Sequence, residues 1–314
     1  MLNDCSDLDG SRTLTGRSAV VTGANSGIGL AVTEQLVKQG AAVIMACRNI
    51  ERAETARDEI ATEETIDRIV IRRCDLADLD VIESFADWVD TEYDALDLLC
   101  NNAGIMAIPF SRTADGFEQQ FGVNHLGHFA ITGRLLDLLC EADGKPRIVT
   151  QSSKMHERTS SIDFDRLDDP SRYSRWQSYA MSKLANVLFA RELDRRLDVA
   201  GESVRSFACE PGFVATNLQL RGPQMDGSRL KETCWRVASR LFGQSPDAGA
   251  RPMVRAATDR ELPRGVYLRP GGFLGMQGAP VADEPSQTAQ DDALANALWE
   301  YSVEQTGVSY GRLV

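Results

Sequence analysis

The chain has 314 residues, of which 43% are hydrophobic and 25% are charged. This length and balance are typical of a soluble globular protein with a substantial core, and they exclude a disordered, collagen-like or coiled-coil chain as a description of the whole. No apolar run is long enough to predict a membrane span, and the acidic, polar residues 1–11 do not resemble a secretory signal.

The charge balance is acidic, with 46 Asp and Glu against 34 Lys and Arg and a formal net charge of −12. This balance disfavours nucleic acids and anionic lipids as partners, because both bind basic surfaces. Only five of the basic residues are Lys. Two interpretations stay open: adaptation to high salt, or coding bias in an ordinary acidic protein.

The seven Cys show no C-x-x-C spacing, which argues against a disulfide framework or a zinc site and favours the reducing cytoplasm.

Apolar, β-rich segments alternate with amphipathic ones along the chain. Strands are predicted at 18–22, 42–47, 68–72, 96–100, 147–151, 203–208 and 265–268. Helices are predicted at 28–40, 51–62, 78–90, 117–140, 179–198 and 293–301. The alternation predicts one α/β domain over residues 16–314, doubly wound, with a mostly parallel sheet of about seven strands and helices on both faces.

Two segments stand outside this alternation. Residues 1–15 are expected to form a flexible N-terminal segment. Residues 217–250 contain Gly–Pro and Ser–Pro breaks, and they predict an insertion. Two interpretations of the insertion remain open: it covers the substrate side of a site, or it is a surface helix pair without function.

A glycine-rich loop, TGANSGIG at residues 22–29, joins the first predicted strand to the first predicted helix. Glycine lets the main chain approach a phosphate, and a helix N-terminus offers free N–H groups. The loop therefore predicts a dinucleotide site, although a tight strand–helix turn would also explain it and the spacing differs from the general G-x-G-x-x-G pattern. The residues expected to contact the dinucleotide are Gly23, Asn25, Ser26, Gly27, Ile28 and Gly29.

The end of the second strand indicates which dinucleotide would bind. A site for NAD usually places Asp or Glu there to bond the ribose 2′-hydroxyl, but this chain has Cys47 and Arg48. Because a guanidinium can hold a 2′-phosphate, the sequence favours NADP(H) over NAD(H); a solvated Arg48 is the alternative. Further cofactor candidates follow the second, third and fourth strands: Asn49, Asp75, Leu76, Asn102, Ala103 and Gly104.

Tyr179 and Lys183 stand four residues apart on a predicted helix, and therefore on one face. A neighbouring ammonium would lower the pKa of the phenol and make it an acid/base for proton transfer. Ser153, at the end of the fifth strand, could donate to a substrate oxygen. Asn124, inside a packed helical segment, needs polar partners; it either holds a water that links Lys183 to solvent or bends the helix through a structural hydrogen bond.

The order of these motifs resembles the short-chain dehydrogenase/reductase family. The resemblance rests on the TGxxxGIG loop, the NNAG segment 101–104, Asn124, Ser153, the Tyr179/Lys183 pair and Pro211–Gly212, and it covers residues 16–216. Within the family, segments 46–49, 123–129, 152–156 and 182–189 are similar to the retinol-dehydrogenase-like branch, which mostly uses NADP(H). The resemblance implies a single Rossmann-like domain.

The resemblance also implies an activity: the NADP(H)-dependent interconversion of an alcohol and an aldehyde or ketone on an apolar small molecule. Tyr179 would exchange the proton, Lys183 would lower the Tyr179 pKa and bond the nicotinamide ribose, and Ser153 would polarise the carbonyl. Asn124 would anchor a relay water. The residues expected to flank the nicotinamide are Pro211, Gly212, Val214 and Thr216. The alternatives are reduction of a C=C bond in a pigment or lipid, and a catalytically silent NADP(H) sensor. A homodimer or homotetramer is implied by analogy.

Several features depart from the family pattern. Ser153 and Tyr179 are 26 residues apart, with an insert at 158–177 that could border the substrate mouth. Glu210 precedes Pro211 where His or Asn is more usual, which leaves its cofactor contacts open. The N-terminal anchor of membrane-bound relatives is not seen, which disfavours a lipid-embedded retinoid enzyme.

The spacing of His125 and His128 favours packing inside the helix over metal binding, and no metal site is expected. His156 either lines the pocket or makes a loop hydrogen bond.

Overall fold

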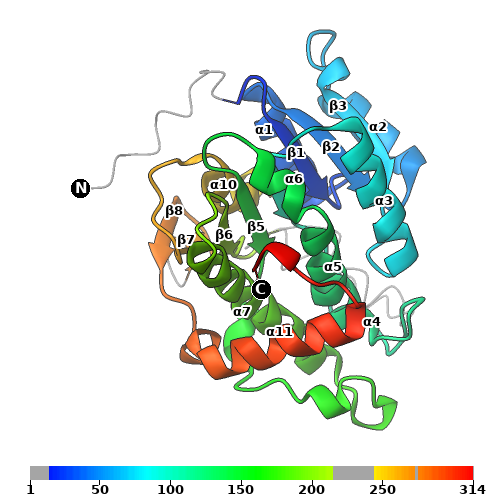
Figure 1. The fold of residues 1–314 in the computed structure, drawn as a ribbon, viewed down its shortest axis with the longest axis vertical. Helices are drawn as coiled ribbons and strands as arrows, with labels where there is room; N and C mark the ends of the chain where they lie inside the picture. The colour runs from blue at the N-terminus through cyan, green and yellow to red at the C-terminus, as the bar shows by residue number, and fades with distance from the viewer. Residues whose placement is uncertain (1–13, 215–243, 273–274, 314) are drawn as a thin grey trace.

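A computed structural model describes residues 14–214, 244–272 and 275–313 of the chain. Its centre is a sheet of eight strands in the order β3-β2-β1-β4-β5-β6-β7-β8 (Figure 1). The strands are β1 (Ser18–Thr22), β2 (Ala42–Cys47), β3 (Ile69–Arg73), β4 (Leu98–Asn101), β5 (Arg147–Gln151), β6 (Arg205–Cys209), β7 (Tyr267–Pro270) and β8 (Pro280–Asp283).

The sheet is parallel from β3 to β7, as predicted, and β8 is an additional antiparallel strand on the edge. The parallel strands β2 and β5 are buried along nearly their whole length, which is why they are apolar at consecutive positions. In contrast, β8 has only four residues, two of them exposed, so its sequence carries too little pattern to predict a strand.

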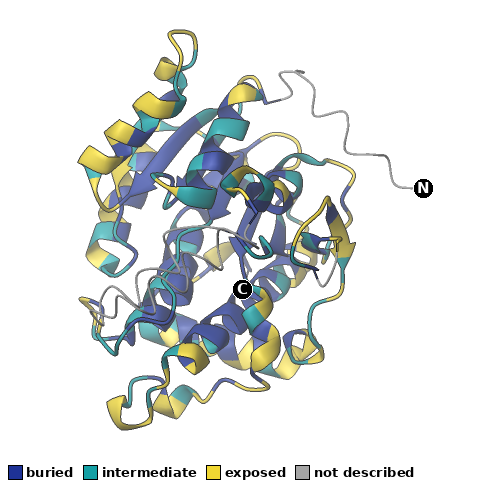
Figure 2. Ribbon diagram, turned by 180° about the vertical axis from the view of Figure 1, so that it is seen from behind, coloured by how far each residue is buried: buried dark blue, intermediate teal, exposed yellow. Residues whose placement is uncertain are grey.

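Helices cover both faces of the sheet, and the outer faces of these helices are exposed (Figure 2). One core layer packs α1 (Gly27–Lys38), α2 (Ile50–Ile60) and α10 (Pro246–Thr258) on the sheet. The opposite face carries α3 (Leu79–Glu92), α5 (Gly127–Arg134), α6 (Leu136–Glu141) and α7 (Arg175–Val199). The C-terminal helix α11 (Asp292–Thr306) lies alongside α7 (Figure 1). The predicted single doubly wound domain is therefore confirmed.

The segment 117–140, predicted as one helix, is divided into several pieces. It begins with the short helix α4 (Gln119–Phe121), continues in a π-helical turn (Gly122–Leu126), and then forms α5 and α6. The Gly127 N–H donates to the Gly122 carbonyl, five residues back. A π turn is an uncommon local insertion in a helix and is frequent at functional sites. Here it contains Asn124.

The segment between β6 and β7 is only partly described. The expected insertion at 217–250 and the candidate Thr216 lie largely or wholly outside the described residues. From Pro246 onward the chain forms α10, which packs on α1 and contributes Ala250, Met253 and Val254 to the core. The internal Pro252 explains why no helix was predicted here, because proline removes a helical hydrogen bond.

The strand order reverses next to β1, whose neighbours are β2 and β4. In open α/β sheets, ligands bind beyond the carboxyl ends of the strands at such a reversal. The loops after β1, β2, β3 and β4 therefore frame the expected site. Among the described helices, none combines the length and apolar character that crossing a bilayer requires.

Candidate active site

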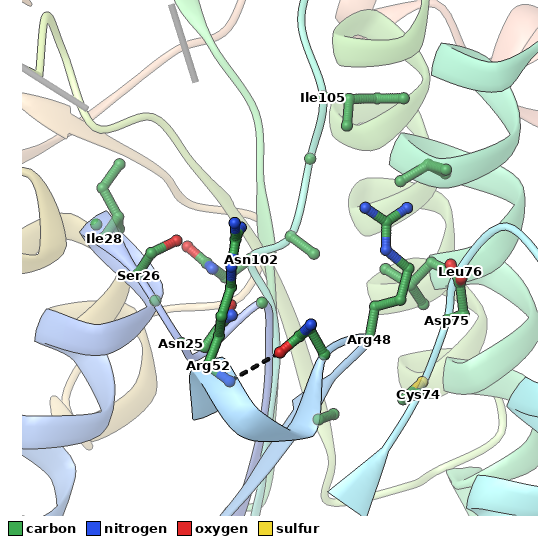
Figure 3. A pocket seen from close by; sticks show the side chains of 18 of the residues that line it. Asn25, Ser26, Ile28, Arg48, Arg52, Cys74, Asp75, Leu76, Asn102 and Ile105 are labelled. Carbon is green, nitrogen blue, oxygen red and sulfur yellow. Dashed lines mark hydrogen bonds between the residues drawn. The ribbon is translucent and has the colours of Figure 1, made fainter. Parts of the chain in front are cut away.

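A groove of about 390 Å³ lies at the carboxyl ends of β1 to β4. Side chains from three successive strand ends, Ser26, Arg48 and Asp75, project toward it (Figure 3). Thirteen of the residues predicted to bind the cofactor line this groove: Gly23, Asn25, Ser26, Gly27, Ile28, Gly29, Arg48, Asn49, Asp75, Leu76, Asn102, Ala103 and Gly104.

The glycine-rich loop lines the groove with main-chain atoms that no side chain covers. Gly23 and Gly27 have positive φ angles of 65° and 55°, which favour glycine. A Cβ on Gly29 would lie 2.4 Å from the Gly23 carbonyl oxygen and from the Asn102 amide nitrogen. At the N-cap of α1, the Ser26 side chain makes no capping hydrogen bond, and the first turn has no acidic residue. The uncapped N–H groups and the helix dipole suit a phosphate.

Two arginines line the groove near the end of β2. Arg48 follows the strand, and Arg52 lies in the first turn of α2. The Asn49 side chain is engaged locally, because its oxygen accepts a hydrogen bond of 2.7 Å from the Arg52 N–H and caps α2 (Figure 3). Among the described residues, no acidic side chain lines this part of the groove, and Asp75, after β3, is the one carboxylate in the lining. The residues present therefore fit a dinucleotide with a phosphate on its ribose.

The loop after β4 is fixed by its own hydrogen bonds. The Thr22 hydroxyl accepts from the N–H groups of Asn102 and Ala103, at 2.9 and 3.0 Å. The Asn102 side chain donates to the Thr22 carbonyl at 2.8 Å. These contacts hold the loop against the end of β1 and leave Gly104 at the groove wall.

Gly104 connects the groove to the buried catalytic candidates. A Cβ on Gly104 would lie 3.3 Å from the Asn124 side-chain oxygen and 3.4 Å from the Lys183 Nζ. Lys183 and Tyr179 lie on α7, and both are buried. The Lys183 Nζ is 5.8 Å from the centre of the Tyr179 ring. The predicted pair therefore lies side by side, directly behind the wall of the groove.

Tyr179 and Ser153 form a hydroxyl pair. The two side chains are hydrogen-bonded, and this contact lowers the Tyr179 pKa, but burial acts more strongly and raises the pKa to about 12. Any lowering of the Tyr179 pKa by Lys183 is therefore outweighed by burial in this arrangement. Lys183 is itself buried, its own pKa is lowered to about 8 by that burial, and its Nζ donates to the Gln151 carbonyl at 3.1 Å. Tyr179 is a neutral phenol at neutral pH.

Asn124 fastens the π turn to the loop after β4. Its side-chain oxygen accepts from the Ile105 N–H at 2.8 Å, and its amide nitrogen donates to the Ile105 carbonyl and lies 2.9 Å from the Ser182 hydroxyl. The side-chain amide therefore has structural partners on every side. The main-chain carbonyl of Asn124 also has a partner, because it lies 2.9 Å from the His128 Nδ1.

His128 and His125 have hydrogen-bond partners that explain their burial. The His128 Nδ1 lies 2.9 Å from the Asn124 carbonyl, and its Nε2 lies 2.9 Å from the Thr22 hydroxyl. The His125 Nε2 is 2.8 Å from the Ser302 hydroxyl. Over the described part of the chain, no cluster of three metal-ligating side chains forms. The packing role predicted for both residues agrees with these contacts.

The segment after β6 lies near the catalytic pair without lining the groove. Gly212 has a φ of 73°, and a Cβ there would lie 2.4 Å from the Met276 carbonyl oxygen. The Pro211 carbonyl accepts a hydrogen bond from the Gln244 side chain. Val214 is buried against Gly249 of α10. The structure thus places Pro211, Gly212 and Val214 in a tightly held turn beside the site.

The insert at 158–177 packs on the loop before α4. The Tyr173 hydroxyl donates to the Ile108 carbonyl at 2.8 Å, and the Gln120 side chain donates to the Tyr173 hydroxyl at 2.7 Å. Buried Glu118 accepts a hydrogen bond from the Ser178 hydroxyl at 2.5 Å. The insert is therefore joined to the N-terminal end of α7, close to Tyr179.

Sequence reasoning missed several groove residues, including Arg52, Ile105 and Gln119. Arg52 could have been found, because it lies one helical turn beyond Arg48 and follows an N-cap Asn. Ile105 and Gln119 belong to a long loop and a short helix, for which residue spacing gives no signal of proximity.

Comparison of sequences identifies relatives along the whole chain. A family model described as short chain dehydrogenase matches residues 17–225. Human retinol dehydrogenase 13 is 39% identical over 299 residues, which cover 94% of this chain and 86% of that protein. Human retinol dehydrogenase 14 is 37% identical over 306 residues, covering 93% of this chain and 87% of that protein.

Solved structures are similar in fold. A crystal structure of an uncharacterised protein from Mycobacterium paratuberculosis has a TM-score of 0.76 and 38% identity, covering 95% of this chain and 96% of that chain. Salutaridine reductase from Papaver somniferum has a TM-score of 0.61 and 22% identity, covering 80% of this chain and 99% of that chain; this second likeness concerns the fold alone.

Proposed function

The chain belongs to the short-chain dehydrogenase/reductase family, and from this membership we propose that it interconverts an apolar alcohol and its aldehyde or ketone with NADP(H). The proposal rests on one observation: Gly104 lines the groove and also lies against the buried side chains of Lys183 and Asn124. A dinucleotide in this groove would lie against the wall behind which the proton-exchanging side chains stand. The family acts on CH–OH donors, so the proposal adds the cofactor preference, the substrate class and the residue roles.

The glycine loop and the N-terminus of α1 would hold the cofactor phosphates. Arg48 would pair with the ribose 2′-phosphate, with Arg52 beside it. When bound, NADP(H) supplies or accepts the hydride. The main chain at Gly23, Gly27 and Gly29 gives the close approach that a diphosphate requires.

Tyr179 would exchange the proton at the substrate oxygen. Its neutral phenol is the form that donates to the oxygen during carbonyl reduction, and the phenolate would accept the proton during alcohol oxidation. The Ser153 hydroxyl, hydrogen-bonded to Tyr179, would bond the same oxygen and polarise the carbonyl. With a Tyr179 pKa of about 12, the phenol is protonated at neutral pH, which is the form that carbonyl reduction needs.

Lys183 and Asn124 would complete the path for the proton. Lys183 lies beside Tyr179, and its lowered pKa of about 8 lets it give or take a proton near neutral pH. The Asn124 main-chain carbonyl lies in the π turn, where it has the His128 ring nitrogen as one partner and can accept a second hydrogen bond. A water on that carbonyl would connect Lys183 with solvent.

A substrate panel tests the proposal. Aldehydes, ketones and retinoids are offered with NADPH and with NADH, and cofactor absorbance is followed. We expect turnover of apolar aldehydes or ketones with NADPH at a higher kcat/KM than with NADH. Hydride transfer to enones but never to carbonyls would contradict the proposed reaction, and NADPH binding without any turnover would favour a sensor.

A further inference from the structure

Glu210 is a buried carboxylate at the end of β6, immediately before the Pro211–Gly212 turn. Only 1% of the residue is exposed. One carboxyl oxygen, Oε2, accepts a hydrogen bond of 3.0 Å from the Tyr267 hydroxyl on β7. The other, Oε1, is buried and has no hydrogen-bond partner in the part of the chain described. A carboxylate with a dry, unpartnered oxygen is costly, so this side chain carries more than a packing role.

A continuous set of contacts links Glu210 to the hydroxyl pair. The Tyr267 ring meets the His156 ring edge-on, with 5.5 Å between centres. The His156 Nδ1 lies 2.8 Å from the Ser153 carbonyl, and its Nε2 accepts from the Ser286 N–H at 3.2 Å. Because each nitrogen has its own partner, His156 is a neutral ring that donates to Ser153. The turn that presents the Ser153 hydroxyl therefore rests on the layer that contains Glu210.

The charged and titratable groups around Glu210 act in opposing directions. Glu157, in the 3-10 turn after β5, raises its pKa, whereas Arg269 on β7 and Lys154 in that turn lower it. Arg269 is also paired with Asp283 of β8, which weakens its effect. Tyr267, Cys209, His156 and Tyr179 are the other titratable groups of this layer. Burial acts most strongly and raises the Glu210 pKa to about 7.

We propose that Glu210 is a positioning residue for Tyr179: its carboxyl supports the Ser153 turn through Tyr267 and His156, and its negative charge, when it forms, opposes the phenolate. The inference rests on the proton exchange proposed above. A charged Glu210 raises the Tyr179 pKa, so it keeps the phenol protonated and favours carbonyl reduction. A neutral Glu210 removes that repulsion and makes Tyr179 a better base for alcohol oxidation.

The test replaces Glu210 with the nearly isosteric, uncharged Gln. The pH dependence of kcat/KM for alcohol oxidation is measured for the wild type and for Glu210→Gln. We expect the midpoint of the alkaline rise to move toward acid by about 0.5–1 pH unit in the variant, since a buried like charge has been removed. The matched control is Glu157→Gln, an exposed carboxyl nearby, whose midpoint should stay within about 0.2 pH unit because solvent screens it.

An equal loss of kcat/KM at every pH, with an unmoved midpoint, would overturn the inference, because a purely structural role predicts that result. If Glu210→Gln does not fold, Tyr267→Phe gives a second test. The Tyr267 hydroxyl is the hydrogen-bond donor to Glu210 among the described residues, and its loss disfavours the charged carboxylate, so Glu210 in Tyr267→Phe should stay protonated to a higher pH than in the wild type, as followed by its infrared carboxylic acid band. A band that disappears at the same or a lower pH in Tyr267→Phe contradicts the inference.

A spectroscopic readout separates this inference from the proposed function. In infrared spectra of the cofactor-free protein, a carboxylic acid band should persist at pH 6, disappear by pH 8 and be missing from Glu210→Gln. A wild type that turns over no alcohol or carbonyl contradicts the proposed function, while the band still reports on Glu210. An identical spectrum in wild type and Glu210→Gln contradicts the inference, whatever the activity.

Discussion

The cofactor groove and the catalytic layer behind it are built in different ways. The groove is made of main chain and partly exposed side chains: glycines at 23, 27 and 29, an uncapped helix N-terminus and two arginines. The catalytic layer, as proposed above, contains the buried titratable side chains Tyr179 and Lys183, together with the proposed positioning residue Glu210. Binding in the groove depends on local backbone shape, whereas the acidity of the catalytic layer depends on burial and on neighbours far apart in the sequence.

The first prediction tests the catalytic layer alone and has the largest expected effect. Tyr179→Phe removes the hydroxyl that we propose to exchange the proton, so we expect turnover to fall about 10³-fold, with NADPH binding unchanged by fluorescence titration. The control is Tyr301→Phe, which removes a hydroxyl from α11 and should leave turnover unchanged. If Tyr179→Phe keeps more than about one tenth of the wild-type turnover, the phenol does not exchange the proton.

The second prediction tests the groove alone. In Gly29→Ala the new Cβ would meet the Gly23 carbonyl at 2.4 Å, and the loop must move away from the phosphate position. We expect the Kd for NADPH to rise about 100-fold, on the scale of overpacking costs. Gly311→Ala is the control, because a Cβ there has no neighbour within 4 Å. Unchanged NADPH affinity in Gly29→Ala would contradict the phosphate site.

The third prediction asks what the arginines of the groove recognise. Arg48→Ala should weaken NADPH binding about 10-fold or more, since a charge-assisted pair with the 2′-phosphate is lost, while NADH binding stays the same. Arg57→Ala, on the neighbouring helix α2 and paired with Asp58 outside the groove, should change the affinity for neither dinucleotide. An equal loss for both dinucleotides would mean that Arg48 does not read the 2′-phosphate. Arg52→Ala, measured in parallel, reports whether the two arginines share this role.

The fourth prediction concerns stability and has the smallest effect. The Glu210 pKa is raised from its usual 4.5 to about 7 in the folded protein. Its contribution to stability is therefore fully present below pH 4.5 and lost as the pH rises through about 7. Gln does not titrate, so Glu210→Gln should gain roughly 2 kcal/mol on the wild type between pH 5 and 8 in urea unfolding. A pH-independent difference would contradict the raised pKa.

The same contrast explains what the sequence could predict. The parallel strands and the helices α1, α2 and α3 were predicted to within a few residues, because each carries an apolar pattern. Helix α7 is buried on most sides, and it begins at Arg175, before its predicted start at 179. The thirteen groove residues were also predicted, since each follows a strand end in a parallel sheet. The antiparallel β8 is too short to carry such a pattern, and it was missed. Helix α10 has an apolar face but was also missed, because it contains proline, which argues against a helix.

The catalytic layer was predicted only as a set of residues. The sequence placed Tyr179 beside Lys183 and indicated that Glu210 is unusual. It could not show that burial raises the Tyr179 pKa or that Lys183 donates to Gln151. Nor could it bring Glu210, Tyr267 and His156 together, because they lie just after β6, in β7 and in the turn after β5. Such contacts depend on tertiary packing, which spacing along one helix or strand does not report.

The π turn at 122–126 makes the length of this segment as important as its composition. Each residue in a helix rotates the chain by about 100°, so deleting one residue there would restore regular winding and turn Asn124 away from α5. Asn124 would then lose its hydrogen bond to either Ile105 or His128. Homologues should therefore tolerate changed side chains in this stretch far better than a changed number of residues.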